Sequence, residues 1–229
     1  MRPVQLALLV TANTLILVVV AGLVARGRMR RVWFFAPYLA TVFLTSTMIG
    51  LWPARFLNWG FWVVKEMAIG LLKLAIALEL SYRVFATLPR AGAAARGLLV
   101  AVLLATAWAA LGAPLSSRDS SEIARVTLSR LGYGTVWLFS VLLVVVAWYR
   151  IPLDPIHKAV LLGFVPYLLT LTVGLSMLEA FGWKLHAVSS YGMSAAYVAL
   201  MAFWAWAAWR PEAVPPADVD VVHRIQPWR

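Results

Sequence analysis

The sequence contains no cysteine and few charged residues or histidines, and each shortage excludes a class of protein. Without cysteine, the chain has no disulfide framework, no thiol nucleophile and no cysteine metal site. Charged residues make up only 13% of the 229 residues, whereas hydrophobic residues make up 63% and the mean hydropathy is +0.85. Soluble domains of this size do not have such a composition. The sequence therefore predicts an all-α integral membrane protein, because helices satisfy every backbone polar group inside a bilayer.

The histidines are too dispersed along the chain to indicate a metal or haem centre. His157 and His186 begin neighbouring hydrophobic stretches at opposite membrane surfaces, and His223 lies in the C-terminal tail. The last hydrophobic stretch has no lysine that could bind retinal, and no phosphate-binding, dinucleotide-binding or metal-binding helix motif occurs. We therefore expect no cofactor and no metal, and enzymatic function is the least favoured class.

Seven hydrophobic stretches are each near or above the roughly 18 to 20 residues that cross a bilayer as a helix. They cover residues 4–25, 32–52, 57–82, 97–114, 123–149, 157–181 and 186–209. The first is too long for the apolar region of a signal peptide, so we interpret it as a membrane span. The sequence thus predicts a seven-helix transmembrane domain over residues 1–209. Residues 210–229 form a short Pro-rich tail, which we expect to be disordered or to bind a partner.

Basic residues are concentrated in alternate connections, and this asymmetry predicts the orientation of the chain. Cytoplasmic loops carry an excess of lysine and arginine, which places the N-terminus outside and the C-terminus inside a cytoplasmic (inner or plasma) membrane. The same placement explains most of the net charge of +11 without a nucleic-acid partner, so the lipid bilayer is the expected contact. The residues assigned to the inner side are Arg26, Arg28, Arg30, Arg31, Arg83, Arg90, Arg96, Arg150, Lys158, Arg210, Arg224 and Arg229.

The third hydrophobic stretch carries charges inside an apolar helix. Such charges are expensive in a membrane and by default mark a site or a buried pair. At 100° per residue, Glu66, Gly70, Lys73 and Ala77 share one stripe of the helix. Glu66 and Lys73 are separated by roughly 10 Å along the axis, which suits two groups flanking one polar cavity. The alternative is that neighbouring helices neutralise both charges, which then only fix the packing.

Polar residues of the other spans fall at a similar depth, in the outer half of the membrane. Arg130 in the fifth span is the natural ionic partner of Glu66 at this depth. Serine and threonine in membrane helices also serve ordinary packing and interhelical hydrogen bonds, so a pocket and a packed polar layer are both open. The predicted ligand-binding residues are Glu66, Lys73, Arg130, Asn13, Thr47, Ser176 and Tyr191.

Spans two and six share a local pattern that suggests an internal repeat. Residues 35–41 (FAPYLAT) align with residues 164–170 (FVPYLLT). Two parallel three-span units joined by a linker span would produce this pattern, with Pro37 and Pro166 as hinge points. This 3+1+3 plan is similar to that of sugar-efflux facilitators and PQ-loop proteins, a resemblance of topology alone because the Pro-Gln pair is absent. Independent helix kinks are the alternative.

These patterns favour a membrane protein that binds a small polar or anionic solute in the outer half of its helix bundle, with transport as an extension of binding. A second hypothesis is a receptor-like sensor or an accessory subunit, which signals through the inner loops or the tail to a membrane or cytoplasmic protein partner. The third is a purely structural subunit in which the charges are paired and no pocket exists.

Overall fold

The computed structural model describes residues 3–86, 97, 101, 120–148, 151–181 and 186–211, and these residues form helices and their connections. The elements are α1 (Pro3–Ala25), the 3-10 helix η1 (Met29–Arg31), α2 (Phe35–Leu51), α3 (Pro53–Phe56), α4 (Trp59–Ala86), α6 (Ser120–Trp148), α7 (Pro155–Phe181) and α8 (His186–Trp209). Helices therefore lie where six of the seven spans are predicted. Most of the predicted span 97–114 and most of the tail fall outside the described residues.

Four of the described helices contain segments that are long and apolar enough to cross a membrane. These segments are Val4–Ala25, Arg130–Trp148, Pro155–Gly174 and Val188–Trp209. Helix α2 is apolar but only 17 residues long, and the 28-residue α4 carries charges within its length. Large apolar side chains point outward from the bundle, for example Trp137, which is 72% exposed. This outward apolar surface is typical of a protein in contact with lipid.

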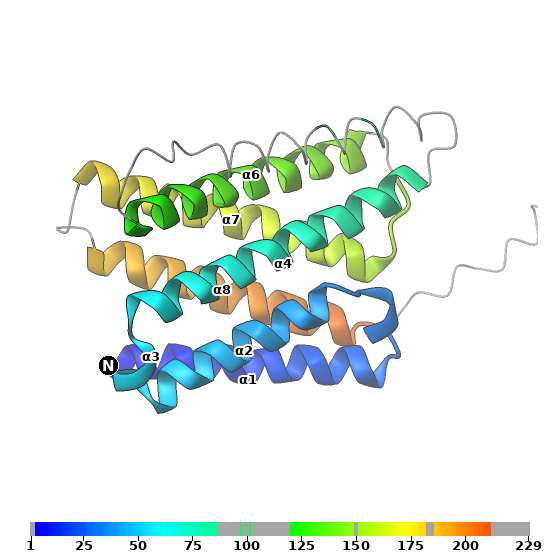
Figure 1. Cartoon of the computed structure of the whole chain (residues 1–229). Coiled ribbons are helices and arrows are strands. Elements are labelled where there is room, and N and C mark those ends of the chain that lie inside the picture. Colours follow the sequence, from blue (N-terminus) through cyan, green and yellow to red (C-terminus); the bar gives the residue numbers. More distant parts are fainter. Residues whose placement is uncertain are drawn as a thin grey trace, which may run out of the picture.

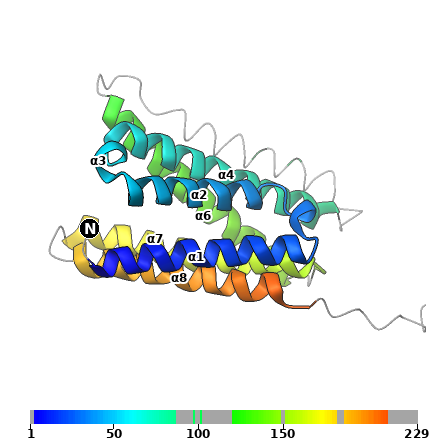
Figure 2. The same cartoon turned by 90° about the horizontal axis from the view of Figure 1, so that it is seen from below.

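The six longer helices pack in a closed ring in which each has two main neighbours. Around the ring the order is α1, α2, α4, α6, α7 and α8, and α8 returns to α1. Figure 1 shows these helices running nearly side by side, and Figure 2 shows α2 and α4 in one layer with α1 and α8 in the other. Cavities between ring neighbours can therefore combine residues that are far apart in the sequence.

Glycines allow the helices around α8 to approach closely. A Cβ atom on Gly22 of α1 would lie 2.8 Å from Trp209 Nε1, and one on Gly163 of α7 would clash with Trp204 Nε1. Both tryptophans donate their indole N–H to backbone carbonyls of these helices, Trp209 to Val18 at 3.0 Å and Trp204 to Ala159 at 3.2 Å. Small residues at such crossings are typical of membrane helix packing.

The two similar patterns of the sequence meet around Trp204, which is fully buried. The Phe35 and Phe164 rings lie 4.7 Å and 4.8 Å from the Trp204 ring. Their prolines nevertheless occupy different positions. Pro37 lies in the first turn of α2, where a helix loses no internal hydrogen bond, whereas Pro166 lies inside α7. A kink caused by a missing hydrogen bond is thus expected at Pro166 and not at Pro37.

A polar network holds the ends of α2, α4 and α7 together. The Glu79 carboxylate of α4 accepts the backbone N–H groups of Trp33 (3.2 Å) and Phe34 (3.1 Å), immediately before α2. Arg83, four residues further along α4, lies 3.3 Å from the same carboxylate, and buried His157 of α7 lies 3.6 Å from it. Glu79 therefore supplies acceptors that the first turn of α2 lacks.

Arg28 fixes the end of α8 against the connection that follows α1. Its buried guanidinium donates hydrogen bonds to the carbonyls of Ala207 (3.1 Å), Ala208 (3.1 Å) and Arg210 (2.8 Å). The last carbonyls of a helix have no partner inside the helix, and a cation there also complements the helix dipole. One arginine thus satisfies three acceptors in a single cap.

Candidate functional site

A cavity of about 320 Å³ between α4, α6 and α7 contains the charged stripe that the sequence predicts. Glu66, Gly70 and Lys73 line it from α4, together with Trp62. Ala77, the fourth residue of the stripe, is fully buried in the core. The facing walls are mostly apolar and consist of Leu128, Leu131, Gly132, Tyr133, Thr135, Val136, Leu168, Leu171 and Thr172. We call this space the Lys73 cavity.

The Glu66 carboxylate has its counter-charge on the adjacent residue. Lys65 Nζ lies 2.9 Å from Glu66 Oε1, and both side chains are partly exposed. The predicted partner, Arg130, is half-buried in α6 and is not among the described side chains that line the Lys73 cavity. The negative charge at one end of the cavity is therefore balanced by Lys65.

Lys73 stands in a different situation from Glu66. Within the part of the chain that the structure describes, no hydrogen bond or ion pair engages the Lys73 amino group. Because Lys65 already balances Glu66, the three charges leave the cavity with a net positive charge when Lys73 is protonated. A lysine on an apolar membrane helix needs a counter-charge or water. The geometry therefore provides one positive group for an anion.

The Lys73 cavity depends on a close contact between α4 and α6. A Cβ atom on Gly70 would lie 2.6 Å from Leu131 Cδ2, so only glycine allows the present position of Leu131. Thr135 uses its hydroxyl to donate a 2.7 Å hydrogen bond to the Leu131 carbonyl. Trp62 is stacked on Trp59, with ring centroids 5.0 Å apart. Polar ligand contacts from these walls are therefore few, and the apolar surface is extensive.

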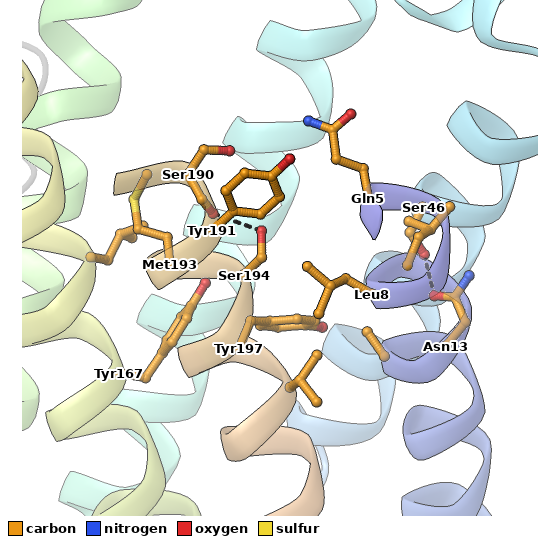
Figure 3. A pocket seen from close by; sticks show the side chains of 14 residues that line it. Gln5, Leu8, Asn13, Ser46, Tyr167, Ser190, Tyr191, Met193, Ser194 and Tyr197 are labelled. Carbon is orange, nitrogen blue, oxygen red and sulfur yellow. Dashed lines mark hydrogen bonds between the residues drawn. The ribbon is translucent and has the colours of Figure 1, made fainter. Parts of the chain in front are cut away.

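A second cavity of about 510 Å³ takes two other residues of the predicted site. Asn13 of α1 and Tyr191 of α8 line this space, with Ser46 of α2 and Tyr167 of α7 (Figure 3). We call it the Tyr197 cavity after a further lining residue. Leu171 of α7 lines both cavities. The structure thus divides the predicted residues between two spaces on either side of α7.

The remaining predicted residues lie outside the described linings of both cavities. Thr47 accepts a 3.4 Å hydrogen bond from Asn13 Nδ2, so it supports a residue of the Tyr197 cavity. Ser176 is exposed on α7. Lys65, Tyr167 and Tyr197 were not among the predicted site residues. Tyr167 lies within the predicted repeat, which was the one sequence signal that could have indicated it.

Comparison with known proteins gives no relative from which a role could be transferred. No protein-family model, no curated protein sequence and no solved structure matches this chain.

Proposed function

We propose that this chain is a seven-span membrane protein that binds a small organic anion in the Lys73 cavity. The observation that carries this proposal is the Lys73 amino group, which lines a mostly apolar cavity without an ionic partner among the described residues. An anion placed there would satisfy the charge of Lys73, and its apolar part would contact Trp62 and the leucines of α6 and α7.

The directions of the helices support seven spans. Helix α4 ends beside η1, because Arg83 donates a 2.6 Å hydrogen bond to the Arg31 carbonyl. Helix α7 begins at the same end, where Asp154 lies 3.0 Å from Arg31. Since α6 runs toward this end, its first residue lies at the opposite end (Figure 1). Helix α4 therefore ends and α6 begins at opposite ends of the bundle, which is compatible with the predicted fourth span.

The arginine-rich end also supports the predicted orientation. Arg26, Arg28, Arg31, Arg83 and Arg210 are joined there by hydrogen bonds to neighbouring segments. An end rich in arginine is the cytoplasmic end by the positive-inside rule. We propose that this end faces the cytoplasm and that both cavities lie toward the external half of a cytoplasmic membrane.

The absence of cysteine makes the orientation directly testable. Leu57→Cys lies at the proposed outer end and Arg30→Cys at the proposed inner end, and each variant would carry a single thiol. On intact cells, a membrane-impermeant maleimide should label Leu57→Cys and spare Arg30→Cys until the cells are opened. The reverse pattern would overturn the orientation without affecting the binding proposal.

Binding is tested by photolabelling of the whole protein in lipid nanodiscs with 4-azidobenzenesulfonate, a permanently charged ring compound. We expect cross-links to peptides of α4, α6 or α7 and competition by benzenesulfonate. Uptake of radiolabelled benzenesulfonate into proteoliposomes then separates a transporter from a protein that only binds. Binding without uptake would favour the sensor hypothesis, and absence of both would favour the structural one.

A further inference from the structure

The Tyr197 cavity differs from the Lys73 cavity in its chemistry. Its described lining contains the hydroxyls or amides of Gln5, Asn13, Ser46, Tyr167, Ser190, Tyr191, Ser194 and Tyr197 and contains no carboxylate, lysine or arginine. An ion that entered it would lose hydration without meeting an opposite charge, which is costly. A neutral molecule with hydrogen-bonding groups would not meet this cost.

Some of these polar groups already have partners. Ser46 Oγ donates to Asn13 Oδ1 at 2.6 Å, and Ser194 Oγ donates to the Ser190 carbonyl at 2.8 Å (Figure 3). These bonds hold the side chains in place but leave hydroxyl lone pairs and amide hydrogens that can still face the cavity. The lining is thus arranged around the cavity before any ligand binds.

The Tyr197 hydroxyl is buried and has no hydrogen-bond partner among the described residues. Figure 3 shows this hydroxyl directed from α8 across the cavity toward Leu8 of α1. A buried hydroxyl without a partner is unfavourable and is rare in folded proteins. A ligand with a hydroxyl or carbonyl group would remove the penalty.

The rest of the lining is aromatic and aliphatic. The Tyr167 and Tyr197 rings lie 5.7 Å apart, and Leu8, Leu171 and Met193 also line the cavity. Such a surface suits a carbon skeleton such as a ring, with a small number of polar groups that set its orientation. The described cavity wall therefore combines apolar surface with hydrogen-bonding groups and contains no charged side chain.

We infer that the Tyr197 cavity is a second binding site, which takes an uncharged ring compound bearing hydroxyl groups. This site lies across α7 from the Lys73 cavity, with Leu171 in both walls. The second site does not depend on the anion site, because the described linings share only Leu171. The two ligands should therefore differ in charge.

The experiment uses a matched pair of photoprobes on the full chain in nanodiscs. The neutral probe is 4-azidobenzyl alcohol, and the anionic probe is 4-azidobenzenesulfonate. The neutral probe should label peptides of α1 and α8, and unlabelled benzyl alcohol should compete. Tyr197→Phe removes only the hydroxyl and should raise the concentration of benzyl alcohol needed for competition by about fivefold. It should leave labelling by the anionic probe unchanged.

Two controls keep the outcomes separate. Tyr82→Phe removes a hydroxyl from an exposed tyrosine outside both cavities and should change neither probe. Lys73→Gln should affect the anionic probe alone. The second site would be overturned if benzyl alcohol competed equally in the parent protein and in Tyr197→Phe, or if the neutral probe labelled all helices. Either result would mean that the Tyr197 hydroxyl meets only water. If the parent protein were labelled by the neutral probe but not by the anionic probe, the function proposed for the Lys73 cavity would be overturned.

Discussion

Lys65 Nζ lies 2.9 Å from Glu66 Oε1, while Lys73 lines the same cavity as Glu66 without such a partner. This relationship determines the sign of the net charge at the cavity. Lys65 balances the charge of the Glu66 carboxylate, and the charge of Lys73 remains unbalanced. Removal of either member of the pair should therefore change anion affinity, and the two changes should have opposite signs.

Glu66→Gln should strengthen the binding of benzenesulfonate. The substitution removes a negative charge from the cavity wall and releases Lys65. Repulsion across roughly 10 Å at an effective dielectric constant near 20 corresponds to about tenfold in affinity. Lys65→Gln is the matched test in the other direction, because it leaves Glu66 without its partner and should weaken binding. Titration of both variants in nanodiscs would contradict this account if their affinities changed in the same direction.

Gly70→Ala should destabilise the contact between α4 and α6. The added methyl group would lie 2.6 Å from Leu131 Cδ2, so Leu131 must move into the cavity or the helices must separate. Overpacking of this kind costs about 1 to 3 kcal/mol. Gly132→Ala is the control, since an added Cβ on this other lining glycine meets nothing within 4 Å. Thermal unfolding in nanodiscs should show a lower midpoint for Gly70→Ala only.

Glu79→Ala should destabilise the start of α2. The change leaves the Trp33 and Phe34 N–H groups without their acceptor and removes the carboxylate beside Arg83 and His157. Loss of one partner from a partly buried polar network costs about 3 kcal/mol.

Hydrogen exchange provides the measurement for Glu79. The amides of residues 33 and 34 should exchange much faster in Glu79→Ala, with a smaller effect in Glu79→Gln, which retains one acceptor oxygen. Unchanged protection of both amides would show that Glu79 does not stabilise this end of α2.

Arg28→Lys should loosen the end of α8 although it keeps the positive charge. A single ammonium group cannot reproduce the fork of N–H donors that reaches Ala207, Ala208 and Arg210. We expect a loss of about 1 to 2 kcal/mol in stability. Arg30→Lys, at an exposed position two residues away, is the matched control. Equal unfolding midpoints for the two variants would contradict the capping role of Arg28.

The helices and the charged stripe of α4 were predictable because each follows from local periodicity. Long apolar runs located six described helices, and a rotation of 100° per residue placed Glu66, Gly70 and Lys73 on one face. The count of seven spans and the membrane orientation go beyond the four described segments that satisfy the length and apolarity of a span. Those two features stay predictions.

The division of the predicted site into two cavities was not predictable from depth alone. Depth along a span gives the height of a residue but not the order of the helices around the ring, so Asn13 and Glu66 could not be separated. The Lys65–Glu66 pair was missed because adjacent helical residues normally point in different directions. The start of α2 beside Pro37 depends on Glu79, a residue distant in sequence. Packing between helices decides the division into two cavities and the contact between Glu79 and the start of α2.

The most direct test of the central claim is the dissociation constant of benzenesulfonate for the parent protein and for Lys73→Gln in nanodiscs. A charge-assisted contact corresponds to a loss of about tenfold or more when Lys73 is made neutral. Lys73→Arg should keep most of the affinity, and a variant that retains the parent unfolding midpoint excludes misfolding as the cause. If Lys73→Gln binds the anion as tightly as the parent protein does, the Lys73 cavity is not an anion site.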